Sequence, residues 1–117
     1  MTAWAGSVAP ASLFLSSVTV QEMELGILRM ERQAPAQGAI LRAWMEGHVL
    51  PAFAERTLAI DTIVARRCAQ LHVPDPKSER DAFIAATALV HGLTLVTRNV
   101  TDFAATGVVT LNPWHSA

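Results

Sequence analysis

Cysteine is almost absent from this chain, since Cys68 is the only one among 117 residues. A single cysteine excludes both an intrachain disulfide and a cysteine-rich zinc site. Cys68 lies in a helical pattern, TLAIDTIVARRCAQL, which favours the role of a small buried apolar residue. The four histidines are scattered without the spacing of metal ligands. We therefore expect neither a disulfide nor a zinc centre.

Long hydrophobic runs are also missing. No stretch approaches the roughly 20 apolar residues that a membrane-spanning helix requires. The first ten residues, MTAWAGSVAP, lack the basic segment and following apolar stretch of a secretory signal. About half of the residues are apolar (51%), which suits one domain over residues 1–117 with a modest core. We expect a soluble cytoplasmic protein with no membrane partner.

An excess of positive charge is absent as well, because the formal net charge is −1. This argues against the broad basic surface of a binder that relies on phosphate contacts alone. A small local site remains open, because eight of the nine basic residues are arginine, which pairs with phosphate in a fixed fork. The candidates are Arg66, Arg67, Arg80 and Arg98. For Arg66 and Arg67 the alternative is a solvated helix face with ordinary ion pairs.

The hydrophobic pattern predicts strands that alternate with helices. In the first half we expect a strand at 13–17, a capping box at 19–22 opening a helix to about 32, helices at about 36–46 and 56–71, and an edge strand at 48–51. In the second half we expect a loop at 73–78, a buried helix at 79–91 stopped by Gly92, a strand at 93–96 and an apolar segment at 108–111. This alternation predicts an α/β fold with a mainly parallel sheet covered by helices.

Three acids stand where carboxylates can converge in such a fold. Glu22 follows the first strand, Asp81 opens the buried helix, and Asp102 follows the strand at 93–96. In open α/β sheets the ligand crevice lies beyond the carboxyl ends of the strands. Gathered carboxylates repel one another unless a cation neutralises them, and hard oxygen ligands suit Mg²⁺ or Mn²⁺.

A structural role for each acid is the alternative. Glu22 fits a capping box after Thr19, Asp81 fits one after Ser78, and Asp102 fits a turn residue. A generic α/β domain whose acids are helix caps therefore stays open, and in such a domain Mg²⁺ or Mn²⁺ should not raise the melting temperature.

Three segments together resemble a known family. The runs LFLSSVTVQEMELGI, RDAFIAATALVHGLTLVTRNVTDF and VVTLNPW are similar to PIN-domain proteins, specifically the VapC and FitB-like toxins of bacterial type II toxin–antitoxin pairs. The similarity runs from about Trp4 to Trp114. It implies a three-layer α/β/α fold and RNA cleavage dependent on Mg²⁺ or Mn²⁺.

The resemblance also implies roles for single residues. Glu22, Asp81 and Asp102 match catalytic, metal-binding acids of the family, with Thr97 and Asn99 supporting them. Arg98 is a candidate contact to RNA phosphate, with a surface salt bridge as its alternative. The implied partners are an RNA substrate, a cognate antitoxin and a second copy in a homodimer.

One departure from the family pattern concerns the start. Family members begin with a central strand ending in a pattern such as LLDTNV, whose aspartate is the first metal ligand, and no segment here matches it. No Asp or Glu precedes Glu22. We therefore expect the N-terminal central strand to be missing. Two hypotheses follow: an endoribonuclease toxin, or a catalytically impaired PIN-like module that keeps only dimer and antitoxin contacts.

Overall fold

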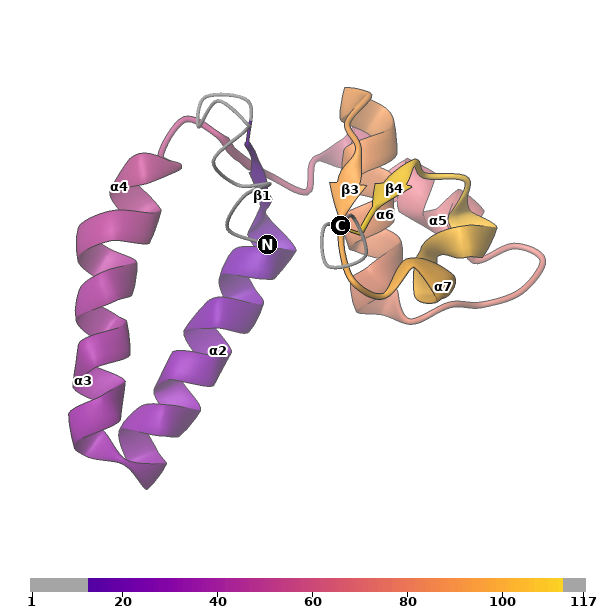
Figure 1. Cartoon of the computed structure of the whole chain (residues 1–117). Helices are drawn as coiled ribbons and strands as arrows, with labels where there is room; N and C mark the ends of the chain where they lie inside the picture. Colours follow the sequence, from indigo (N-terminus) through magenta and orange to yellow (C-terminus); the bar gives the residue numbers. More distant parts are fainter. Residues whose placement is uncertain (1–12, 113–117) are drawn as a thin grey trace. The chain divides into compact units, whose positions relative to one another are not determined.

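The computed structural model describes residues 13–112, which form two units. The N-terminal unit is Phe14–Leu58, and the C-terminal unit contains residues 59–112 together with Leu13. Figure 1 shows the elements of each unit along the chain. Trp4 and Trp114, the ends of the similarity seen in the sequence, lie outside the described residues.

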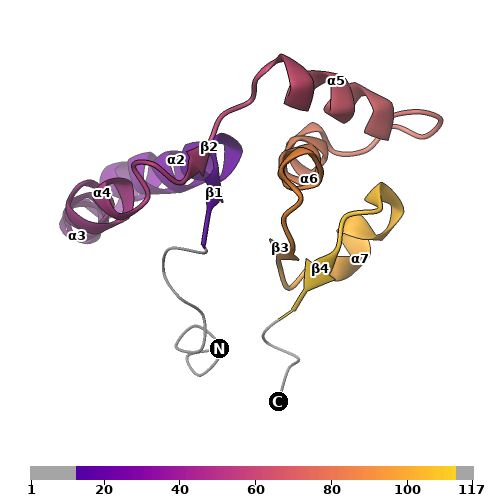
Figure 2. The same ribbon diagram turned by 90° about the horizontal axis from the view of Figure 1, so that it is seen from above.

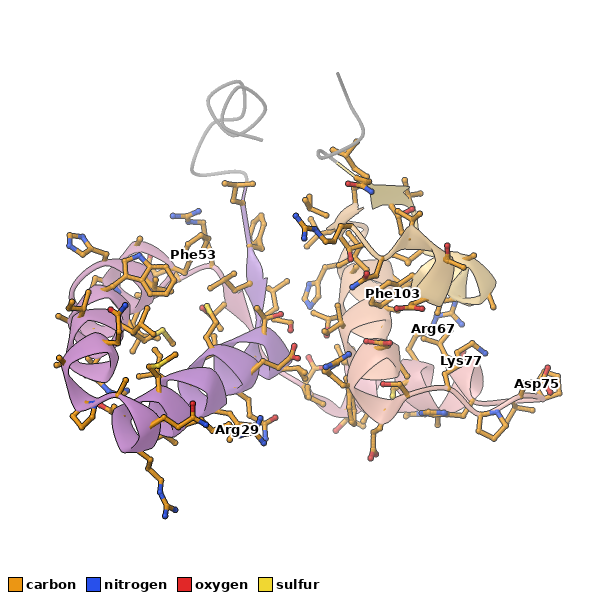
Figure 3. All side chains as sticks on the ribbon, turned by 60° about the horizontal axis from the view of Figure 1, so that its bottom comes forward. Arg29, Phe53, Arg67, Asp75, Lys77 and Phe103 are labelled. Atoms are coloured by element: carbon orange, nitrogen blue, oxygen red, sulfur yellow. The ribbon has the colours of Figure 1, made fainter. Side chains whose placement is uncertain are left out.

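The N-terminal unit is a helical hairpin with a short parallel strand pair. Its elements are β1 (Leu15–Ser16), α2 (Ser17–Gln33), α3 (Pro35–Trp44), the π-helical turn η2 (Met45–Val49), α4 (Leu50–Ala52) and β2 (Thr57–Leu58). Strand β1 pairs in parallel with β2, Leu15 opposite Thr57. Figure 1 shows α2 and α3 side by side. The apolar sides of the helices meet around buried Ile27, Met45 and Val49, with Phe53 packed against them (Figure 3).

The two long helices approach closely at Gly38. This glycine is buried in α3, and a Cβ added to it would lie 2.5 Å from the Cα of Glu31 in α2. One turn later, Arg42 reaches back to α2, with its Nη2 2.7 Å from Glu24 Oε2 and its Nε 3.2 Å from Glu31 Oε2. The absence of a side chain at Gly38 therefore brings the backbones together, and Arg42 bridges the helices beside that contact.

The segment at 48–51 was predicted to be an edge strand, and that prediction is wrong. The chain remains helical from Pro35 to Ala52, so Gly47 does not end the second helix. Met45 and Val49, four residues apart, both point into the core and hold this path. Pro51 provides no N–H to continue the helical hydrogen bonds, and the helical run ends one residue later, at Ala52.

The C-terminal unit combines helices with a second parallel strand pair. It contains α5 (Thr62–Leu71), α6 (Glu79–His91), β3 (Leu95–Val96), α7 (Val100–Phe103), the 3-10 turn η3 (Ala104–Thr106) and β4 (Thr110–Leu111). Strand β3 pairs in parallel with β4, Leu95 opposite Thr110. Figure 2 shows α5 crossing α6. The predicted α/β class with parallel strands is thus confirmed.

Helix α6 is the centre of this unit. Ala82, Ala85 and Ala86 are fully buried, and they pack with Val64 of α5 and Phe103 of α7 in one core. The predicted bounds of this helix, 79–91, are confirmed, as is its stop at Gly92, which adopts a left-handed φ of 65°. Small side chains allow the neighbouring helix to come close to the α6 backbone.

Other boundaries differ from the sequence predictions. The third helix begins at Thr62 rather than near residue 56, because the Asp61 side chain accepts a hydrogen bond from the N–H of Val64 and caps it. Thr57 and Leu58 instead pair with β1. Strands β1 and β3 are each two residues long, shorter than the strands predicted at 13–17 and 93–96. Within residues 13–112, no helix has the length and apolar character needed to cross a membrane.

Replacing Gly38 with alanine tests the close helix contact. We expect Gly38→Ala to destabilise the protein by about 1–3 kcal/mol, because the added methyl group would overlap the backbone of Glu31. Gly26→Ala is the matched control, since nothing lies within 4 Å of a Cβ there, and it should stabilise α2 by roughly 0.5–1 kcal/mol. Urea denaturation measures both changes. Equal effects at the two positions would contradict the contact.

Candidate functional site

Glu22 lies in the second turn of α2, in the N-terminal unit. The prediction that it belongs to a capping box opened by Thr19 is wrong, because the helix begins earlier, at Ser17. Ser16 is the N-cap, and its Oγ accepts a hydrogen bond from the N–H of Thr19 at 3.0 Å. Glu22 is exposed. Capping therefore does not explain an acid at this position.

Asp81 lies in the first turn of α6, as predicted. The Ser78 side chain caps this helix and accepts a hydrogen bond from the N–H of Asp81 at 3.3 Å. A carboxylate here is also favoured by the helix dipole. The Asp81 side chain is 17% exposed, and its Oδ1 lies 3.4 Å from Nε of Arg80. The cap fixes the backbone of Asp81, and the partly exposed carboxylate stays accessible to a ligand.

The predicted supporting residues follow β3. The N–H of Thr97 donates to the carbonyl of Leu111, which extends the pairing with β4, while Thr97 Oγ1 accepts from the N–H of Asn99 at 3.0 Å. The carbonyl of Arg98 accepts from Asn112 Nδ2 at 3.4 Å. Thr97 thus holds the backbone of the turn that presents Arg98 and Asn99, both of them exposed.

Asp102 lies in α7, directly after this turn. Its N–H donates to the carbonyl of Asn99 at 3.1 Å, so the predicted polar turn is in fact the start of a short helix. The Asp102 side chain belongs to an exposed residue, whereas its neighbour Phe103 is buried and anchors α7 in the core. The buried phenylalanine fixes which way the short helix faces.

The path of the chain brings the N-terminus of α6 and the segment after β3 to the same end of the C-terminal unit. Helix α6 ends at Gly92, and β3 then runs back along it, as Figure 1 shows. Asp81 and Asp102 are therefore at one end of this unit, beyond the carboxyl end of β3. This is where parallel α/β structures place ligands.

The third predicted acid, Glu22, belongs to the other unit. Neither unit, over residues 13–112, gathers three or more His, Cys, Asp or Glu side chains in a group able to hold a metal ion. The convergence of Glu22 with Asp81 and Asp102 therefore stays a prediction.

Other acids of the N-terminal unit are occupied by Arg42. The guanidinium contacts Glu24 and Glu31 in α2, and its Nη1 lies 3.6 Å from Glu46 Oε2. The hydrogen bond from Arg42 holds the pKa of Glu24 below its usual value, and Glu24 and Glu31 raise the pKa of Arg42. This cluster was not among the features predicted from the sequence, although the four-residue spacing of Arg42 and Glu46 was a signal for it.

The thiol of Cys68 is buried, as predicted. Burial raises its pKa, and the charge of Glu79 raises it further, so the protonated thiol is favoured. His72 Nε2 lies 3.9 Å from Sγ, while Nδ1 accepts the N–H of Lys77 at 3.1 Å. The arrangement favours a structural role for this pair over nucleophilic chemistry.

Comparison with known proteins gives consistent results. The PIN domain family matches residues 2–108. The VapC ribonuclease Y4jK of Sinorhizobium fredii is 36% identical over 120 residues, covering 98% of this chain and 84% of the relative. Toxin FitB of Neisseria gonorrhoeae is 35% identical over 121 residues, covering 98% and 85%. The crystal structure of FitAcB from Neisseria gonorrhoeae superposes with a TM-score of 0.90 at 34% identity, covering 97% of this chain and 84% of that one.

The Ser78 cap provides a test of how Asp81 is positioned. We expect Ser78→Ala to destabilise the protein by about 1 kcal/mol, because the N–H of Asp81 loses its acceptor. Ser78→Asp is the control, since aspartate is an equally good N-cap and should keep most of the stability. Urea denaturation measures the difference. The capping role of Ser78 would be refuted if both variants unfolded at the same midpoint urea concentration as the unchanged protein.

Proposed function

The chain belongs to the PIN-domain family, and from this membership we propose that it is a metal-dependent endoribonuclease toxin of a toxin–antitoxin pair. The relatives named as a VapC ribonuclease and as toxin FitB match nearly the whole chain. The observation that carries the proposal is that the start of α6, which contains Asp81, and α7, which contains Asp102, lie at the same end of the C-terminal unit (Figure 1).

The donor set fits a hard divalent cation. Glu22, Asp81 and Asp102 offer only carboxylate oxygens, the ligands that suit Mg²⁺ or Mn²⁺. We propose that these three acids hold the metal. A bound divalent ion supplies charge that lowers the pKa of an attacking water and offsets negative charge on the phosphate.

The protein's own contribution is positioning. Ser78 fixes the first turn of α6 and with it the backbone of Asp81. Thr97 fixes the turn that carries Asn99, and Arg98 in that turn is our candidate for contacting an RNA phosphate. No side-chain nucleophile is needed, which agrees with the buried, protonated state of Cys68.

The proposal extends to fold and partners. We propose that residues 1–117 form one PIN-like domain with a three-layer α/β/α arrangement. Its partners would be a cognate antitoxin, an RNA substrate and a second copy of the chain. The alternative is a catalytically impaired module that keeps the dimer and antitoxin contacts.

Calorimetric titration with Mn²⁺ distinguishes the metal-dependent nuclease from the catalytically impaired module. We expect the intact chain to bind Mn²⁺ saturably. Asp81→Asn should weaken the Mn²⁺ affinity by about tenfold or more, because a side chain that binds the metal directly loses its charge. Asp75→Asn is the matched control: Asp75 is an exposed acid of the same unit, outside the proposed site, and its loss should leave binding unchanged.

RNA cleavage is then measured with the same variants. Cleavage that requires Mn²⁺ and is lost in Asp81→Asn but retained in Asp75→Asn would support the nuclease. A chain that melts cooperatively yet binds no Mn²⁺ and cuts no RNA would refute it and leave the impaired module.

A further inference from the structure

An open groove on the C-terminal unit lies away from the first turn of α6, which contains Asp81. It has a volume of about 280 Å³ and is lined by Ile63, Arg66, Arg67 and Gln70 of α5 and by Val90 of α6. These residues gather where α5 crosses α6, as Figure 2 shows for the two helices. Val90 is nine residues after Asp81 in α6, which places the groove about 13 Å along the helix from the start that carries Asp81.

Arg66 and Arg67 in the groove form no ion pair with an acid among the described residues. No carboxylate lies within ion-pair distance of either guanidinium in the described part of the chain, in contrast to Arg42, which contacts three. Arg67, labelled in Figure 3, donates from Nη1 to Gln70 Oε1 at 2.8 Å. This neutral partner restrains the side chain without cancelling its charge. The predicted ion pairs of Arg66 and Arg67 are therefore not formed, while the exposed position of Arg66 agrees with a solvated helix face.

The lining is chemically divided. Arg66 and Arg67 provide planar donors that match phosphate oxygens in pairs. Ile63 and Val90 provide apolar surface, and Ile63 is 65% exposed. A nucleotide has the same division, with an anionic phosphate joined to a ribose and a base whose faces are weakly polar. An acidic peptide would match both parts only where its sequence places an apolar side chain beside a carboxylate, whereas every nucleotide of an RNA joins an anionic phosphate to a weakly polar base.

We propose that this groove binds the backbone of single-stranded RNA, with Arg66 and Arg67 on a phosphate and Ile63 and Val90 against the adjoining nucleoside. The inference rests on the proposed function, and it deepens that function by naming a binding subsite outside the acidic site. RNA held there would continue along α6 toward Asp81.

Fluorescence anisotropy with a labelled oligouridine of about 12 nucleotides tests the subsite. Binding is measured in EDTA, so that metal and cleavage play no part. We expect the double variant Arg66→Gln/Arg67→Gln to weaken binding on the order of tenfold, because two charge-assisted contacts are lost. The dependence of log affinity on log salt should become shallower by about 0.7 for each phosphate contact removed.

The matched control is Arg29→Gln/Arg32→Gln, which removes the same charge from α2 (Figure 3 labels Arg29). It should change the affinity less than twofold, roughly the effect of net charge alone. A single thermal transition at the same temperature in both double variants, followed by circular dichroism, establishes that each is folded.

Two outcomes would overturn the subsite. One is an equal loss of affinity in the two double variants, which would show a charge effect with no specific location. The other is displacement of the RNA by oligoglutamate of equal charge at lower concentration than by unlabelled oligouridine, which would identify a protein-docking surface. The nuclease proposal is judged separately, since metal-dependent cleavage with an unaffected Arg66→Gln/Arg67→Gln variant would retain the nuclease and remove only the groove.

Discussion

The burial of α6 is the constraint on which the candidate site depends. Ala82, Ala85 and Ala86 have no exposed surface, so this helix cannot turn or slide without opening the core of its unit. Its two ends are fixed as well, by the Ser78 cap and by the left-handed Gly92. Since the helix is held in this way, the return of the chain through β3 brings the segment after the strand to the end of the unit where α6 begins. The position of Asp81 relative to Asp102 is thus a consequence of packing by residues that take no part in chemistry.

Sequence reasoning succeeded where local signals and burial agree. For the helix at 79–91, a capping serine, an apolar interior and a terminal glycine all indicate the same bounds, and the structure has them. It failed at 48–51, where Gly47 and Pro51 are local signals for a break, because burial of Met45 and Val49 stabilises a continued helical path. Burial of this kind depends on residues distant in the sequence, such as Ile27, and no short window of sequence contains them.

Among the three acids, local signals again predict some positions, while distant contacts decide another. The positions of Asp81 and Asp102 after or before particular elements could be predicted, because each depends on an adjacent helix start or strand end. The cap of α2 could not, since Ser16, Ser17 and Thr19 are all competent N-caps and only the pairing of β1 with β2 decides where the helix begins. With the helix starting at Ser17, Glu22 has no capping role. The structure therefore removes the simplest structural explanation for this acid and leaves its similarity to the family's metal ligands as the reason for singling it out.

A protein that cleaves RNA at a carboxylate site needs positive charge elsewhere on its surface to bind the RNA. A site made of carboxylates repels phosphate until cations neutralise it, so the acids themselves contribute no affinity for RNA. With a net charge of −1 the protein has no general excess of positive charge to compensate. Attraction must therefore come from a few guanidiniums that are not already paired with acids. Arg42 cannot serve, because Glu24, Glu31 and Glu46 surround it. Arg66 and Arg67 meet the requirement, since their neighbours in the groove are a neutral amide and two aliphatic side chains. A low net charge is thus compatible with RNA binding when the acids neutralise one arginine and leave others facing solvent.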